Sequence, residues 1–269
     1  MKTKAILSAL MLIGGATCLV SCNKLVDKAM QAVMENAFNH NYEDSEKWGK
    51  VVTVDLPTVD FHEVELSGAV RLEYRQDSTY SVQAYGPEKA IAAYIISTED
   101  GELEASQKEG GSSVNKDTPA ITLRITAPYL TEVKGAGASE IIFTDSLSQD
   151  YGLDINLAGA GKLSLGNLKA KELDVTLAGA GEVRMDSVCC EEDIEVELNG
   201  AAGIRGKLTC RKLKMKMAGA GEGKLDIHCQ QARVSASGSA NLTLTGECHN
   251  IESTSFGSSS INKDGLKKR

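Results

Sequence analysis

Apolar and polar residues alternate along most of the chain beyond residue 130, and a glycine interrupts each alternating stretch. In the clearest stretch, every second residue of LDINL (153–157) is apolar, Gly159 follows, and the alternation resumes in KLSL (162–165). The same arrangement surrounds Gly179 and Gly200. A period of two places alternate side chains on opposite faces of a strand, so the pattern predicts strands with one buried face.

The interrupting glycines recur at a nearly constant interval. They are Gly137, Gly159, Gly179, Gly200, Gly219, Gly238 and Gly257, with successive gaps of 22, 20, 21, 19, 19 and 19 residues. A period near twenty indicates a solenoid, whose stacked units bury apolar faces that no unit buries alone. Gly68 fits the same frame, since Val64 and Leu66 precede it. We therefore expect an all-β chain folded as a parallel β-helix with about 19–22 residues per coil.

The repeated sequences LAGAGKL (157–163) and LAGAGEV (177–183) raise the question of a phosphate-binding loop. A dinucleotide-binding fingerprint needs a helix directly after its glycines, whereas here a second strand is predicted. A Walker loop needs a glycine five residues before the Gly161-Lys162 pair, and Asn156 occupies that position. We interpret each glycine as a structural corner, where the backbone adopts a conformation that side chains disfavour.

The pattern before residue 130 is less regular. Pro87 suits the first turn of a short helix that ends near Ala93. Asp100-Gly101 predicts a hairpin turn between strands at 94–98 and 102–106, and residues 120–126 predict a further strand. We therefore take 51–129 as the N-terminal part of the folded region, 130–262 as the β-helix repeats and 263–269 as a basic tail.

The start of the chain is typical of a targeting segment. Lys2 and Lys4 precede a short apolar run at 5–16, which is too short to cross a bilayer and favours a signal peptide over residues 1–21. The sequence LVSC that ends at Cys22 resembles a bacterial lipobox, which implies a lipidated Cys22 and a membrane anchor. The alternative is an ordinary signal peptide with an incidental cysteine.

Residues 22–50 form the expected tether. Apolar residues between Leu25 and Phe38 recur at helical spacing, with polar residues on the other face, which predicts an amphipathic helix. This helix could lie on the membrane surface or pack on the folded region.

Two features together resemble one bacterial family. Phe61, Val64 and Gly68 form a Phe-x-x-Val-x-x-x-Gly stretch, and Gly-Ala-Gly-x-hydrophobic corners follow in series. Over residues 50–262 the chain resembles the family called "putative auto-transporter adhesin, head GIN domain". The resemblance implies a right-handed parallel β-helix and an adhesion role, and it brings no catalytic residues. One departure is Gly223, which stands where a hydrophobic residue is expected and suggests a local bulge.

Four cysteines, Cys189, Cys210, Cys229 and Cys248, each follow a corner glycine by ten residues. Stacked coils should place them in one column, about 4.8 Å apart, as a ladder of buried thiols. One disulfide, with neighbouring Cys190 as a possible partner, is an alternative. Zinc held by adjacent cysteines with His228 or His249 is another.

A second column lies five residues before each glycine and faces outward. Its members are Asp154, Asp174, Glu195, Lys214, Arg233 and Glu252. We expect solvated charges, with Glu195 attracting Lys214. Calcium among the acids is the alternative, although this ion needs six or more oxygen ligands.

Charge and residue types argue against some classes of function. The formal net charge of −8 leaves little with which to neutralise the phosphates of a nucleic acid. The four histidines, His40, His62, His228 and His249, are scattered, and no Ser/His/Asp set is apparent. Tyr74, Tyr80, Tyr85 and Tyr94 offer either a sugar-stacking platform or core packing.

We therefore predict a lipid-anchored, non-enzymatic protein of the cell envelope, attached to the outer membrane and without cofactor or metal. Its rigid β-helix would present a surface for adhesion to, or binding of, a protein or glycan. The alternative is a carbohydrate-active hydrolase or lyase on the same scaffold, and a small-lipid carrier is a third possibility.

Overall fold

The computed structural model describes residues 45–108 and 118–268. The expected signal peptide, Cys22 and the amphipathic segment lie outside these residues. Within the described part of the chain, no helix has the length and apolar character needed to cross a membrane.

Among the described residues, fourteen strands join in one sheet, and the helices α3 and α4 lie in the N-terminal half. The N-terminal elements are α3 (Ser45–Trp48), β1 (Val51–Leu56), β2 (Glu63–Gln76), β3 (Ser81–Pro87), α4 (Glu88–Ala92), β4 (Tyr94–Glu99), β5 (Glu102–Gln107) and β6 (Ile121–Ala127). The remaining strands are β7 (Glu132–Phe143), β8 (Leu147–Ser148), β9 (Leu153–Ala170), β10 (Leu173–Cys190), β11 (Asp193–Ala220), β12 (Glu222–Gly238), β13 (Asn241–Gly257) and β14 (Ser260–Lys268).

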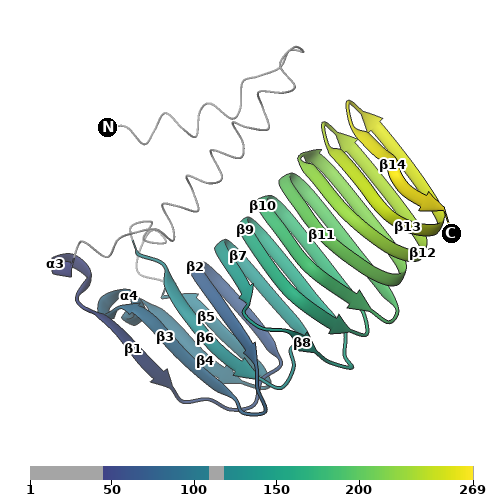
Figure 1. Cartoon of the computed structure of the whole chain (residues 1–269). Coiled ribbons are helices and arrows are strands. Elements are labelled where there is room, and N and C mark those ends of the chain that lie inside the picture. The colour runs from purple at the N-terminus through teal and green to yellow at the C-terminus, as the bar shows by residue number, and fades with distance from the viewer. Residues whose placement is uncertain (1–44, 109–117, 269) are drawn as a thin grey trace, which may run out of the picture.

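Parallel pairing of equivalent strands builds the solenoid and confirms the expected β-helix. The order β2-β7-β9-β10-β11-β12-β13-β14 follows the chain, and Figure 1 shows these long strands stacked side by side. In the middle coils Leu157, Leu177 and Leu198 lie in register and are buried. Each coil therefore extends a continuous apolar interior that its neighbours complete.

The corner glycines differ from the expectation in one respect, because strand pairing runs without a break through Gly137, Gly159, Gly179 and Gly200, whereas β12 and β13 end at Gly238 and Gly257. Gly159, Gly179 and Gly200 pair in register within β9, β10 and β11. The φ angle of Gly179 is +137°, which side chains rarely adopt. A Cβ atom there would also lie far inside contact distance of the Gly159 carbonyl oxygen. Both the backbone conformation and the close stacking of coils therefore require glycine.

Gly223 causes no bulge, contrary to the sequence-based expectation. It pairs with Ile204 and Leu242 in an unshifted ladder, and only Gly221 separates β11 from β12. A Cβ atom at Gly223 would collide with the Leu242 side chain, so Leu242 fills the space that a larger residue would take. A register shift occurs instead between Met185 and Val188 of β10, opposite β11.

The N-terminal end of the solenoid is closed by antiparallel strands. β4 pairs antiparallel with β5, and Asp100 and Gly101 both have positive φ, which confirms the expected hairpin turn. Helix α4 occupies the predicted segment after Pro87. Strands β1, β3 and β6 extend the sheet beyond β2 (Figure 1).

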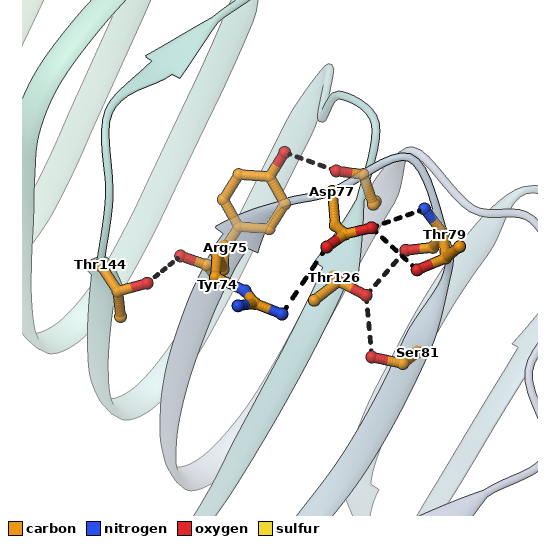
Figure 2. Close-up of polar contacts among 8 residues, drawn as sticks. Tyr74, Arg75, Asp77, Thr79, Ser81, Thr126 and Thr144 are labelled. Carbon is orange, nitrogen blue, oxygen red and sulfur yellow. Dashed lines mark hydrogen bonds and ion pairs between the residues drawn. The ribbon is translucent and has the colours of Figure 1, made fainter.

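Polar contacts fasten the turn after β2 to its neighbours (Figure 2). The Tyr74 hydroxyl donates to the Ala127 carbonyl oxygen at 3.0 Å, and burial raises the pKa of this phenol. The Thr126 hydroxyl donates to the Thr79 carbonyl oxygen at 2.7 Å. Asp77 accepts hydrogen bonds from the backbone N–H and hydroxyl of Thr79, which lower the pKa of its carboxyl group. These bonds fix β2, β3 and β6 relative to one another.

The expected basic tail belongs, up to Lys268, to strand β14. This strand pairs in parallel with β13 from Ser260 to Lys268. Ile261 and Leu266 pack against the core, while most other side chains of β14 are exposed. The strand thus forms the C-terminal edge of the sheet (Figure 1).

Candidate binding surface

Outward-facing side chains form straight columns because the coils stack in register. Asp154, Asp174 and Glu195 lie opposite one another, and Glu132 extends the row on β7. Burial, followed by the neighbouring carboxylates of Asp154 and Glu195, raises the pKa of Asp174 to about 6. Lys214 continues the column on the next coil and pairs with Glu195. Lys214 therefore neutralises Glu195 at one end of the acidic row, and Lys134 Nζ lies 2.7 Å from the Glu132 carboxylate at the other end.

A second column, after the corner glycines, alternates in charge. Arg71, Glu140, Lys162 and Glu182 lie in register on β2, β7, β9 and β10. Glu140 is buried, and its carboxylate contacts both Arg71 Nη2 at 2.6 Å and Lys162 Nζ at 3.0 Å. These ion pairs favour the observed register of the strands, because a shift of one strand by one residue would move its charged side chain to the opposite face of the sheet.

The cysteine column differs from the sequence prediction at its first member. Cys210, Cys229 and Cys248 lie in register, but Cys189 is exposed and lies opposite Thr209. The shift between Met185 and Val188 adds a residue to β10, which turns Cys189 outward and the buried Cys190 inward.

The thiols of the cysteine column are free. Cys229 Sγ lies 3.4 Å from Cys248 Sγ, and burial is the main cause that raises the pKa of Cys210 to about 12. A groove of about 540 Å³ beside the column is lined by Cys210, Cys229, His228 and His249, among others. Among the described residues, no three His, Cys, Asp or Glu side chains converge as metal ligands.

Three aromatic rings gather where the chain enters successive long strands, at the opposite end of each coil from the corner glycine. We call His62, Tyr129 and Tyr151 the aromatic corner. The ring centroids of His62 and Tyr129 are 5.9 Å apart, and those of Tyr129 and Tyr151 are 4.5 Å apart. Tyr151 is the outermost member and is 51% exposed. The three rings come from separate segments, before β2, before β7 and before β9.

Gln149 holds two of these segments together from inside. Its side chain is buried, and its Nε2 donates to the carbonyl oxygens of Leu130 at 2.8 Å and Gly152 at 3.2 Å. The backbone N–H of Leu130 donates to Gln149 Oε1 at 3.3 Å. Because Leu130 follows Tyr129 and Gly152 follows Tyr151, this one side chain fixes the spacing of both rings.

The third ring is fixed by the β4–β5 hairpin. His62 Nδ1 lies within hydrogen-bond distance, 3.1 Å, of the Gly101 carbonyl oxygen. A Cβ atom at Gly101 would lie only 2.7 Å from His62 Cε1, so the imidazole covers this glycine. The ring is therefore held between the hairpin and Tyr129.

The tyrosines singled out from the sequence do not form this surface. Tyr74 and Tyr94 are core residues, and Tyr80 is half-buried with its ring 5.6 Å from that of Phe61. Tyr85 lies beneath the Arg124 guanidinium at 4.8 Å. Sequence reasoning missed the aromatic corner, yet a signal was present. Tyr129 and Tyr151 each precede a corner glycine by eight residues, so equal register places them side by side.

The fold and these columns define a β-solenoid that exposes a regular side-chain array. The sequence profile of the family "putative auto-transporter adhesin, head GIN domain" matches residues 60–206 and 188–269. The chain belongs to that family.

Solved structures share the fold. The crystal structure of a putative adhesin from Bacteroides fragilis superposes with a TM-score of 0.67 at 19% identity, covering 79% of this chain and 96% of that chain. A putative lipid binding protein from Parabacteroides distasonis gives 0.61 at 19% identity, covering 82% and 98%. A putative adhesin from the same species gives 0.55 at 15% identity, covering 79% and 96%. No curated protein matches the chain.

Proposed function

We propose that this protein is a lipid-anchored, non-enzymatic component of the cell envelope that presents its β-helix for adhesion or binding. One observation carries the proposal: an unbroken parallel ladder extends from β2 to β14 and arrays charged and aromatic side chains at fixed spacing. A surface ordered before binding loses little conformational entropy on association, which favours affinity. Membership of a family named for adhesins supports the same role.

The anchor is assigned to Cys22 on the strength of its lipobox-like surroundings. The full chain expressed in a bacterium should partition into detergent and incorporate radiolabelled palmitate. Cys22→Ser should abolish both, whereas Cys18→Ser, four residues earlier in the same segment, should preserve them. Palmitate incorporation by Cys22→Ser would contradict the anchor.

The binding role is tested with cells that display the lipoprotein. They should adhere to glycan-coated or protein-coated surfaces more than cells that express Cys22→Ser, and the purified protein should release no sugar from the retained polysaccharide. Equal adhesion by both cell types would contradict the role. Release of reducing ends or unsaturated sugars would support the hydrolase or lyase alternative.

A further inference from the structure

We propose that the aromatic corner binds a neutral hexopyranose unit of a glycan through stacking on Tyr151 and Tyr129. The inference rests on the proposed function, in which the β-helix presents a binding surface, and it assigns that surface a position and a class of ligand. The other described tyrosines of the first coils lie in the core or stack against other side chains. A sugar that stacks on tyrosine rings in this part of the solenoid would therefore bind at the aromatic corner.

The rings provide a preformed apolar platform. Tyr151 is half exposed although the strands on both sides of it are well packed, and Tyr129 and His62 extend the ring system beneath it. Rigid aromatic rings supply contact area at low entropic cost, and their faces attract the weakly positive C–H bonds on one face of a pyranose.

The platform is held in place by hydrogen bonds to the backbone that carries its rings. Gln149 spends its buried amide on the backbone that flanks Tyr129 and Tyr151, and the Gly101 carbonyl oxygen lies against the His62 imidazole. Preorganisation of this kind lowers the cost of ordering side chains when a ligand binds.

The groups around the rings decide which ligand suits the platform. The Glu172 side chain lies over Gly152, next to Tyr151, since a Cβ atom at Gly152 would meet Glu172 Cγ at 2.9 Å. Asp60 is exposed just before β2. Burial is the main cause that raises the pKa of Tyr80, and the Asp60 carboxylate and the Tyr129 phenol also raise it, so both groups lie near Tyr80. Carboxylates accept hydrogen bonds from sugar hydroxyls and repel anions. The complementary ligand therefore has a C–H face, several hydroxyl donors and no negative charge.

The experiment is saturation-transfer difference NMR on the full chain in detergent, followed by titration. The probes are maltotetraose, cellotetraose and mannotetraose, with tetragalacturonate as a charged counterpart of similar size. We expect at least one neutral tetrasaccharide to bind and tetragalacturonate to bind at least tenfold more weakly. Tyr151→Ala should weaken the neutral complex about tenfold or more, and Tyr151→Phe should weaken it less.

Phe256→Ala is the matched control, because Phe256 is the other strongly exposed aromatic residue of the described solenoid, at 65%. It should leave the affinity unchanged, and thermal unfolding should show that each variant is folded. The proposal is overturned if no neutral probe binds, if Tyr151→Ala binds as well as the parent, or if a peptide library occupies the corner while the sugars do not. Adhesion of displaying cells without sugar binding would refute this inference alone, whereas loss of both would refute the proposed function as well.

Discussion

Gln149 and Leu130 exchange a reciprocal pair of hydrogen bonds, in which a side-chain amide takes the place of a neighbouring strand. The Leu130 N–H donates to Gln149 Oε1 at 3.3 Å, and Gln149 Nε2 donates to the Leu130 carbonyl oxygen at 2.8 Å. Both groups are buried, and β8 ends one residue before Gln149. The amide thereby satisfies backbone groups that the short strand leaves behind.

Replacing Gln149 by methionine, which has a similar length and no hydrogen-bonding amide, should destabilise the protein. We expect a loss of about 1–3 kcal/mol in the free energy of unfolding, because the backbone groups of Leu130 would remain buried without partners. Gln83→Met is the control, since Gln83 bonds to Asp55 in an exposed pair. It should change stability by less than about 0.5 kcal/mol. Equal denaturant midpoints for the two variants would show that Gln149 has no such role.

The alternating charge column makes a separate prediction at Glu140. Glu140→Gln removes the anion that both Arg71 and Lys162 contact, and we expect a loss of about 1–2 kcal/mol because the acid is buried while the cations are partly solvated. Glu252→Gln removes the partner of Arg233, where both side chains are exposed, and should cost less than about 0.5 kcal/mol. Chemical denaturation measures both, and an effect at Glu252 as large as that at Glu140 would contradict the argument.

The acidic column predicts a pH dependence centred on Asp174. Its pKa is raised to about 6 in the folded chain, so the folded state holds this proton more tightly than the unfolded state. Ionisation therefore destabilises the fold as pH rises from about 4 to about 6, and the penalty is fully present at neutral pH.

Asp174→Asn should accordingly raise the melting temperature at pH 7.5 and change it little at pH 4. The gain should stay below about 1 kcal/mol, because neighbouring groups remove only part of the water around this carboxylate and the remaining solvent screens the repulsion. High salt should reduce it further. Asp145→Asn, at an exposed site between strands, is the control and should give the same small change at both pH values. A larger gain for Asp174→Asn at pH 4 than at pH 7.5 would reverse the predicted sign.

The two faces of β10 predict the order of cysteine reactivity. In the native protein, iodoacetamide should label the exposed Cys189 first, while Cys190 and Cys210 should react only after denaturation. Burial raises the pKa of both thiols to about 12, which leaves little reactive thiolate. Peptide mass mapping over time measures the order. Labelling of Cys190 ahead of Cys189 would place the strand in the opposite register.

The sequence was informative where structure is local and repeated. Alternating residues and the spacing of glycines predicted the coils, because strand period and positive φ depend on neighbours in the chain. The prediction for Cys189 was wrong because one extra residue between Met185 and Val188 reverses the faces that follow, and its position depends on pairing with β11. The role of Gln149 was beyond reach for a similar reason, since its partners are supplied by another coil.

The central claim is that the repeated glycines are steric corners required by stacked coils, and Gly179→Val tests it most directly. Valine at Gly179 would face both an unfavourable φ of +137° and collision with the Gly159 carbonyl. The same residue at Ser164, which lies on an outward strand position between Ile142 and Arg184, should be tolerated. Thermal unfolding should show Gly179→Val less stable by at least about 1–3 kcal/mol and Ser164→Val nearly unchanged. Equal melting temperatures for the two variants would contradict the claim and reopen the question of a ligand at the corners.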